Sequence, residues 1–163
     1  LSYGLTWELL IALTFISMLI IIMVSDFNFM IIPDEVLLVF GVLLSIEIAC
    51  IHGFNHLVLS YGNGVLAVIF IYILKLIGDF IFKKESMGGG DIKLMAVFGL
   101  VLGWEMAVIS IFVASFIGLP ISLIILNKKN TNIIPFGPFL SVAAILILLT
   151  GLNMDMIINL LTI

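Results

Sequence analysis

Six apolar segments joined by short polar breaks constrain this chain more than any other feature of its sequence. Each segment is nearly continuous in apolar residues and has no polar stripe, as expected of helices that contact lipid and one another. The breaks contain the glycine and polar residues that loops require. The segments are residues 5–24, 31–50, 65–82, 92–103, 107–126 and 135–152. We therefore predict an all-α, polytopic membrane protein with about six transmembrane helices.

Composition supports this interpretation and limits the number of domains. Of 163 residues, 64% are hydrophobic and 10% are charged, whereas soluble domains are roughly half apolar and a quarter charged. A bilayer span uses about 20 residues, so the chain is long enough for one membrane domain and no more. We predict a single transmembrane domain over residues 1–163, in contact with membrane lipid.

The position of the lysines predicts how the segments cross the membrane, because cytoplasmic loops carry an excess of basic residues. If all six segments cross, the breaks after residues 82 and 126 face the same side, and each contains a lysine pair. The pairs are Lys83 with Lys84 and Lys128 with Lys129. Segment 92–103 is only about 18 Å long, so a re-entrant path is the alternative, but it would separate the two pairs. We predict six crossings with both termini outside.

Several classes of ligand find no support in the sequence. The net charge is −4, with six lysines and no arginine, so a nucleic-acid surface is not expected. His52 and His56 are four residues apart but lack a third ligand, and the lone Cys50 adds none, so we predict no metal site. No glycine-rich phosphate-binding motif is present, so no nucleotide cofactor is expected.

Two aspartates at segment ends are the candidates for chemistry. Asp26 follows the first segment and Asp91 opens the fourth, and the predicted topology puts both at the cytoplasmic face. Neither has a cation at helical spacing; Lys93, two residues after Asp91, points elsewhere on a helix. Two close carboxyls cannot both ionise, which is the arrangement of an aspartic protease. The alternative is that they are interfacial or helix-capping residues.

The residues around the aspartates have structural as well as functional interpretations. Gly88, Gly89 and Gly90 would let an extended substrate backbone approach Asp91, although a flexible linker is the simpler explanation. Pro33 and Asp34 are typical of the first turn of a helix, so Asp34 is predicted to act as a helix-terminal acid.

Two further motifs are predicted to be structural. Gly99 and Gly103 form a pair of small residues that allows close helix packing. The sequence from Ile134 to Pro138 contains two prolines and is interpreted as the start of a helix.

Three motifs together resemble one known family. They are Val24-Ser25-Asp26 followed by Ile32-Pro33-Asp34, the block Met87-Gly88-Gly89-Gly90-Asp91-Ile92-Lys93-Leu94, and Ile134-Pro135-Phe136-Gly137-Pro138-Phe139. The chain resembles the bacterial type IV prepilin leader peptidases, especially the competence-type enzymes, over essentially its whole length. The core of the resemblance is a G-x-G-D motif at Gly88, Gly90 and Asp91.

The resemblance implies a function and a set of site residues. It implies an aspartic peptidase, a hydrolase of the bacterial cytoplasmic membrane, that cleaves the leader of type IV prepilins or pseudopilins used in pilus assembly, competence and secretion. Asp26 and Asp91 would be catalytic, without a cofactor. Gly88, Gly89, Gly90, Lys93, Pro33 and Asp34 would shape the site. The apolar helix of the substrate would pack at Gly99, at Gly103 or on segment 107–126.

The sequence also departs from the family and leaves rival interpretations. Full-length relatives carry an amino-terminal methylating region, and nothing in this chain matches it, so methyl transfer is not expected. A presenilin-like G-x-G-D protease that cuts inside the membrane is the first alternative. A non-enzymatic transporter or assembly subunit whose acids relay protons is the second, although such proteins usually place acids in the middle of a span.

Overall fold

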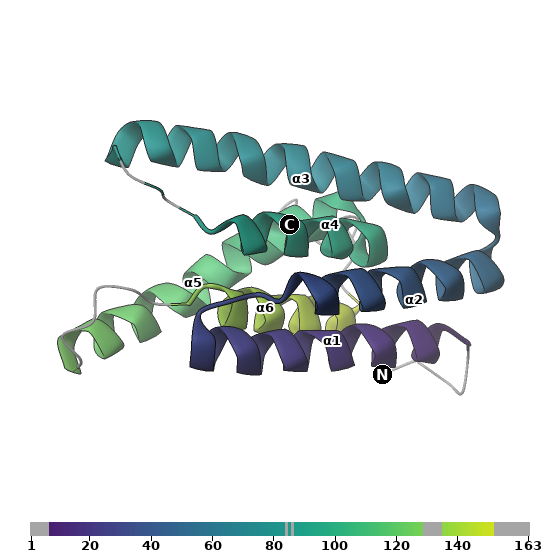
Figure 1. Ribbon diagram of the computed structural model, residues 1–163, viewed down its shortest axis with the longest axis horizontal. Coiled ribbons are helices and arrows are strands. Elements are labelled where there is room, and N and C mark those ends of the chain that lie inside the picture. Colours follow the sequence, from purple (N-terminus) through teal and green to yellow (C-terminus); the bar gives the residue numbers. More distant parts are fainter. Residues whose placement is uncertain (1–6, 84, 86, 129–134, 152–163) are drawn as a thin grey trace, which may run out of the picture.

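The structure, a computed structural model, describes residues 7–83, 85, 87–128 and 135–151. These residues form helices and connecting turns, with no strand among them, as predicted (Figure 1). The helices are α1 (Trp7–Phe29), α2 (Asp34–His52), α3 (Phe54–Phe82), α4 (Gly89–Leu102), α5 (Trp104–Lys128) and α6 (Gly137–Thr150).

The chain is a polytopic membrane protein. Helices α1, α2, α3 and the Trp104–Ser122 part of α5 are long and apolar enough to cross a bilayer. Large apolar side chains face outward, such as Phe80 and Phe116 with 85% and 82% of their surface exposed. Helices α4 and α6 have 14 residues each, about 21 Å, which is less than the roughly 30 Å of hydrocarbon. Whether α4 and α6 cross the bilayer therefore stays a prediction. The outside placement of the termini stays a prediction as well, because residues 1–6 and 152–163 lie outside the described residues. Lys84 and Lys129 also lie outside them.

Helix α4 is the central element of the bundle. It packs against α2, α3, α5 and α6, and Figure 1 shows it between α3 and α2. Its side chains Leu94, Met95 and Phe98 are completely buried. The ring of Phe98 meets that of Phe15 of α1 edge to face, with centroids 5.6 Å apart. This core contact joins the two helices that carry the candidate aspartates.

The predicted break over residues 52–64 is wrong, because α3 begins at Phe54. A single residue, Gly53, makes the turn between α2 and α3 with a φ of +87°, a conformation that glycine adopts at little cost. The polar residues that suggested a loop lie on the helix instead. Tyr61, for example, forms a 2.8 Å hydrogen bond with Ser45 of α2. This hydrogen bond joins α2 to α3.

Glycine brings α3 and α4 into close contact. A Cβ on Gly99 would lie 2.6 Å from the carbonyl oxygen of Asn63 and 2.7 Å from the Cα of Gly64, so no larger residue fits there. The packing role predicted for Gly99 is confirmed, but the pairing with Gly103 is wrong. Gly103 ends α4 with a φ of +84° and has no neighbour within 4 Å of an added Cβ. Because α3 occupies the face at Gly99, a substrate helix cannot pack there.

Candidate active site

Asp26 lies inside α1, in its last turn, and not in the break that the sequence predicted. The helix continues to Phe29, and Met30 closes it with a φ of 55° and an amide bonded to the carbonyl oxygen of Asp26. Asp26 follows a buried apolar face whose members recur at helical spacing, and its side chain is 7% exposed. That face comprises Phe15, Met18, Leu19 and Ile22. The carboxylate therefore extends the buried face of α1 toward the protein interior.

The first residue of α6 contacts this carboxylate. The amide of Gly137 donates a hydrogen bond of 2.9 Å to Oδ2 of Asp26. A Cβ on Gly137 would lie 2.5 Å from the same oxygen, so the contact requires glycine. The sequence pattern predicted the start of a helix here, and the family resemblance included this motif, but neither predicted a contact with Asp26.

Asp91 lies in the first turn of α4, outside the four long spanning helices, and is 8% exposed. The pKa of its carboxyl is raised to about 7, mainly by burial and in addition by the negative charge of Asp26, against a backbone hydrogen bond with Gly88 that lowers it. Asp26 and Asp91 also line one cavity, described below. The structure thus brings together the two aspartates that the sequence singled out.

Two of the three glycines before Asp91 belong to α4 itself. Gly89 and Gly90 are already helical, and Gly88 precedes the helix with extended backbone angles. A Cβ on Gly90 would lie 2.9 Å from the Cβ of Ile32, so Gly90 lets the α1–α2 linker pack against α4. Only Gly88 and Gly90 line the cavity described below, whereas Gly89 has open space around it.

Asp34 and Lys93 form an ion pair outside the cavity. Their atoms Oδ2 and Nζ are 2.6 Å apart, and the side chains are 63% and 57% exposed. Pro33 occupies the N-cap position of α2, and no side chain caps this helix. Asp34 is in the first turn as predicted, and the ion pair with Lys93 is its main contact. Lys93 pairs with Asp34 and does not line the cavity that contains Asp26 and Asp91.

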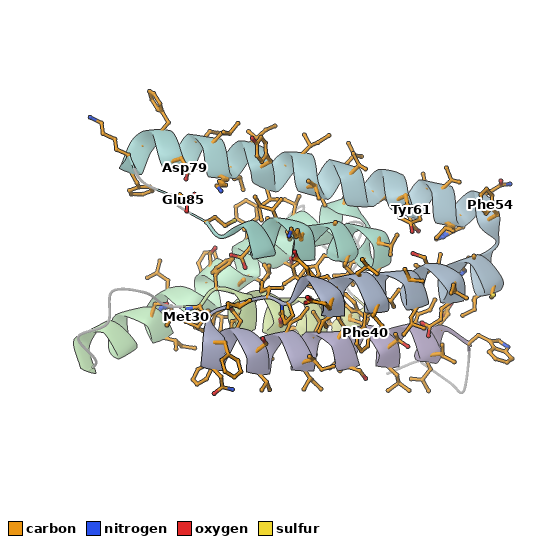
Figure 2. The ribbon with its side chains drawn as sticks, in the orientation of Figure 1. Met30, Phe40, Phe54, Tyr61, Asp79 and Glu85 are labelled. Atoms are coloured by element: carbon orange, nitrogen blue, oxygen red, sulfur yellow. The ribbon has the colours of Figure 1, made fainter. Side chains whose placement is uncertain are left out.

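A cavity of about 750 Å³ contains both aspartates. Three carboxylates line it, those of Asp26, Glu85 and Asp91, and none of the lysines that the structure describes does. The other lining residues are mainly apolar: Met30, Ile32, Met87, Gly88, Gly90, Ile111, Ser115, Pro135 and Phe136. Figure 2 shows that Met30, at the end of α1, and Glu85, before α4, lie at the same end of the molecule. The volume is that of a typical ligand site, and it suits a short stretch of extended peptide.

Sequence reasoning missed several residues of this cavity. Glu85 stands close to the glycine motif, but its sequence position gave no sign that it lines the cavity with Asp26. Ile111 and Ser115 come from the middle of α5, inside an apolar run without a distinguishing signal. One feature of the sequence pointed to Phe136 as a site residue, namely its place in the third motif of the family resemblance.

Comparisons with known proteins identify the family of the chain. Residues 13–123, which include both aspartates, match the type IV leader peptidase family. The chain is 34% identical to a prepilin leader peptidase/N-methyltransferase of Legionella pneumophila, over 96% of this chain and 54% of that protein. Proteins of the same name from Aeromonas hydrophila and Bacillus subtilis are 36% and 32% identical, over 90% and 91% of this chain and 48% and 59% of their own lengths.

The chain thus spans about half the length of the curated relatives it matches. No solved structure matches it significantly. The family match covers well over half of the chain and contains both buried aspartates. This chain belongs to the type IV leader peptidase family.

Proposed function

We propose that this chain is the peptidase part of a type IV prepilin leader peptidase. It would be an aspartic endopeptidase of the bacterial cytoplasmic membrane that removes the leader of prepilins or pseudopilins at the cytoplasmic face. The observation that carries the proposal is one cavity lined by two buried carboxyls, Asp26 from α1 and Asp91 from α4. The names of the relatives support the choice of substrate.

The proposed reaction needs the two carboxyls and one water molecule. One carboxylate removes a proton from the water, whose oxygen attacks the scissile carbonyl carbon, while the protonated partner donates to the carbonyl oxygen. In the second step the first carboxyl gives its proton to the amide nitrogen and the carbon–nitrogen bond breaks. The re-formed carbonyl returns a proton to the second carboxyl, so both groups end as they began. The proposal assigns peptide cleavage to this chain, and not methyl transfer.

The surface next to the cavity supports a substrate with an apolar helix. Helix α5 supplies Ile111 and Ser115 to the cavity. On another face it exposes Phe112, Phe116 and Leu119 by 56%, 82% and 63%. A precursor helix that remains in the bilayer would pack on this face and bring its leader junction to the aspartates. Van der Waals packing is one of the forces that hold helices together in membranes.

The position of the aspartates favours this function over the presenilin-like alternative. A protease that cuts inside a span needs its aspartates within the membrane interior, whereas Asp26 is in the last turn of α1 and Asp91 in the first turn of α4. A transporter whose acids relay protons would place them in the middle of a span. Both carboxyls are at helix ends, beside a cavity large enough for peptide.

Cleavage in reconstituted membranes tests the proposal. The full chain is placed in phospholipid vesicles with a type IV prepilin, and the products are mapped by mass spectrometry. We expect one cut, at the junction of leader and apolar helix, and no cut in a single-span membrane protein that lacks a leader. A folded chain that leaves the prepilin intact would contradict the proposal. Cuts within the apolar helix of the substrate would favour the presenilin-like alternative.

A further inference from the structure

The amide of Gly137 is the polar group that the structure places directly on Asp26. Its nitrogen lies 2.9 Å from Oδ2, and both residues are buried. Helix α6, which Gly137 begins, has no ionisable side chain among its described residues Gly137–Thr150. The hydrogen bond on the carboxylate therefore comes from the backbone of α6, not from a side chain.

The N–H of Gly137 has no hydrogen-bond acceptor within α6. The first amides of an α-helix lack an intrahelical acceptor, and Pro138 has no N–H to donate. The next two amides, of Phe139 and Leu140, both donate to the carbonyl oxygen of Phe136. The positive end of the α6 dipole and the N–H of Gly137 are thus available to Asp26 together. Both favour a carboxylate over a neutral carboxyl.

The other charged groups near Asp26 do not provide that stabilisation. Asp91 and Glu85, which line the same cavity, are both acidic. Asp34, the first acid of α2, is engaged outside the cavity with Lys93. Since the described charged neighbours in the cavity repel a second negative charge, the backbone of α6 is, within the described part of the chain, the group that favours ionisation of Asp26.

We propose that Gly137 is a positioning residue that holds Asp26 as the ionised member of the pair, which makes Asp26 the general base and Asp91 the proton donor. The inference rests on the proposed peptidase function and adds the role of each carboxyl. Asp26 takes a proton from the attacking water and later passes it to the leaving amide nitrogen. Asp91 gives its proton to the carbonyl oxygen and recovers it when the carbonyl re-forms. The pKa of about 7 at Asp91, raised mainly by burial, agrees with a carboxyl that carries a proton near neutral pH.

Replacing one backbone atom tests the hydrogen bond without adding bulk. The residue glycolic acid, introduced at position 137 by a chemically acylated tRNA, turns the amide into an ester and removes the N–H. We expect kcat for prepilin cleavage to fall about 10- to 100-fold, the range for losing a hydrogen bond to a charged group, with KM within about twofold. We also expect the acidic limb of the kcat profile to move to higher pH, because the base loses the donor that stabilises its charge.

Matched variants separate this role from general damage to the helix. The same ester at Gly62 of α3, a glycine with open space around it, removes an ordinary backbone N–H far from the cavity and should leave the pH profile unchanged. Gly137→Ala should lower kcat at least as much as the ester, because its Cβ would meet Oδ2 of Asp26. Gly118→Ala is its control, since that Cβ would lie 3.1 Å from the ring of Phe139 in the same turn of α6, away from Asp26.

The outcomes distinguish the inference from the proposed function. An ester at position 137 with normal kcat and an unshifted profile would overturn the inference, provided that Asp26→Asn is inactive. Equal losses from the esters at 137 and 62, or from Gly137→Ala and Gly118→Ala, would overturn it as well. Failure of the unmodified chain to cleave prepilin would instead contradict the proposed function.

Discussion

Lys93 of α4 and Asp34 of α2 form an ion pair, with Nζ and Oδ2 2.6 Å apart, across the outside of the candidate active site. The pair connects the helix that carries Asp91 to the first residue of α2, just after the linker that follows Asp26. Both side chains are more than half exposed, and such pairs contribute only about 0–1 kcal/mol to stability. We therefore interpret the pair as a contact that orients α2 and α4, without a role in proton transfer.

The first prediction follows from this pair. Asp34→Asn should lower the rate of prepilin cleavage by no more than about tenfold, because it removes an exposed ion pair and leaves both cavity carboxyls in place. The exchange Asp34→Lys with Lys93→Asp should restore part of the loss. Initial rates in vesicles measure both. If Asp34→Asn were inactive while Asp26→Asn cleaved normally, Asp34 and not Asp26 would be the catalytic aspartate of the first motif.

The second prediction concerns the packing of the linker against α4. Gly90→Ala places a Cβ 2.9 Å from the Cβ of Ile32, so either the linker or the start of α4 must move. We expect a loss of about 1–3 kcal/mol in unfolding free energy, together with reduced cleavage. Combining it with Ile32→Gly, which removes that Cβ, should recover part of the stability. Gly41→Ala, in open space on α2, serves as the control in the same denaturation assay. A fully stable and active Gly90→Ala would show that this contact is dispensable.

The third prediction is a dependence of stability on pH. The pKa of Asp91 is about 7 in the folded chain and near its ordinary value of 3.8 in the unfolded chain. Between these values the folded chain binds the extra proton, so stability falls as pH rises from about 4 to about 7 and is constant above that range. Asp91→Asn removes this contribution. In thermal unfolding, the stability of the Asn variant should therefore increase relative to that of the wild type as pH rises through this window.

Asp34→Asn is the control for that measurement, because it changes an exposed carboxyl. A constant difference between the wild type and Asp91→Asn across the window would contradict the raised pKa. The same group predicts that cleavage declines above about pH 7, where the pair loses its shared proton.

The fourth prediction is the membrane topology. Single cysteines at Lys83 and Lys128, in a chain with Cys50→Ser, should both resist an impermeant reagent added outside intact cells, since six crossings place both lysine pairs in the cytoplasm. A cysteine at the exposed Asn55, in the α2–α3 turn region, should react. Protection at only one of the two lysine positions would show that α4 does not connect opposite faces.

The sequence predicted the helices well and their ends less well. Apolar content identifies a helix in lipid, but polar residues do not mark its end. His56, Ser60 and Asn63 suggested a loop and lie on α3, while the actual turn needs only Gly53. Asp26 was predicted to follow its helix, yet it is held within the last turn because its side chain faces protein and not water.

Site residues that stand out in the sequence could be predicted, whereas contacts that depend on helix packing could not. Asp26 and Asp91 could be predicted because a carboxyl in an apolar chain is conspicuous. The contact of Gly137 could not, because it is made by a backbone amide and depends on how α6 packs beside α1. Glu85 and Ser115 reach the cavity only through the path of the chain before α4 and the angle of α5.

The most direct measurement of the central claim compares prepilin cleavage by the wild type with cleavage by Asp26→Asn and Asp91→Asn in the same vesicles. An amide nearly matches a carboxylic acid in shape but cannot exchange a proton with water, and acid–base catalysis is worth about 10² to 10⁴ in rate. We expect both variants to fold and to leave the precursor uncleaved. Cleavage at the wild-type rate by either folded variant would contradict the assignment of Asp26 and Asp91 as the catalytic pair.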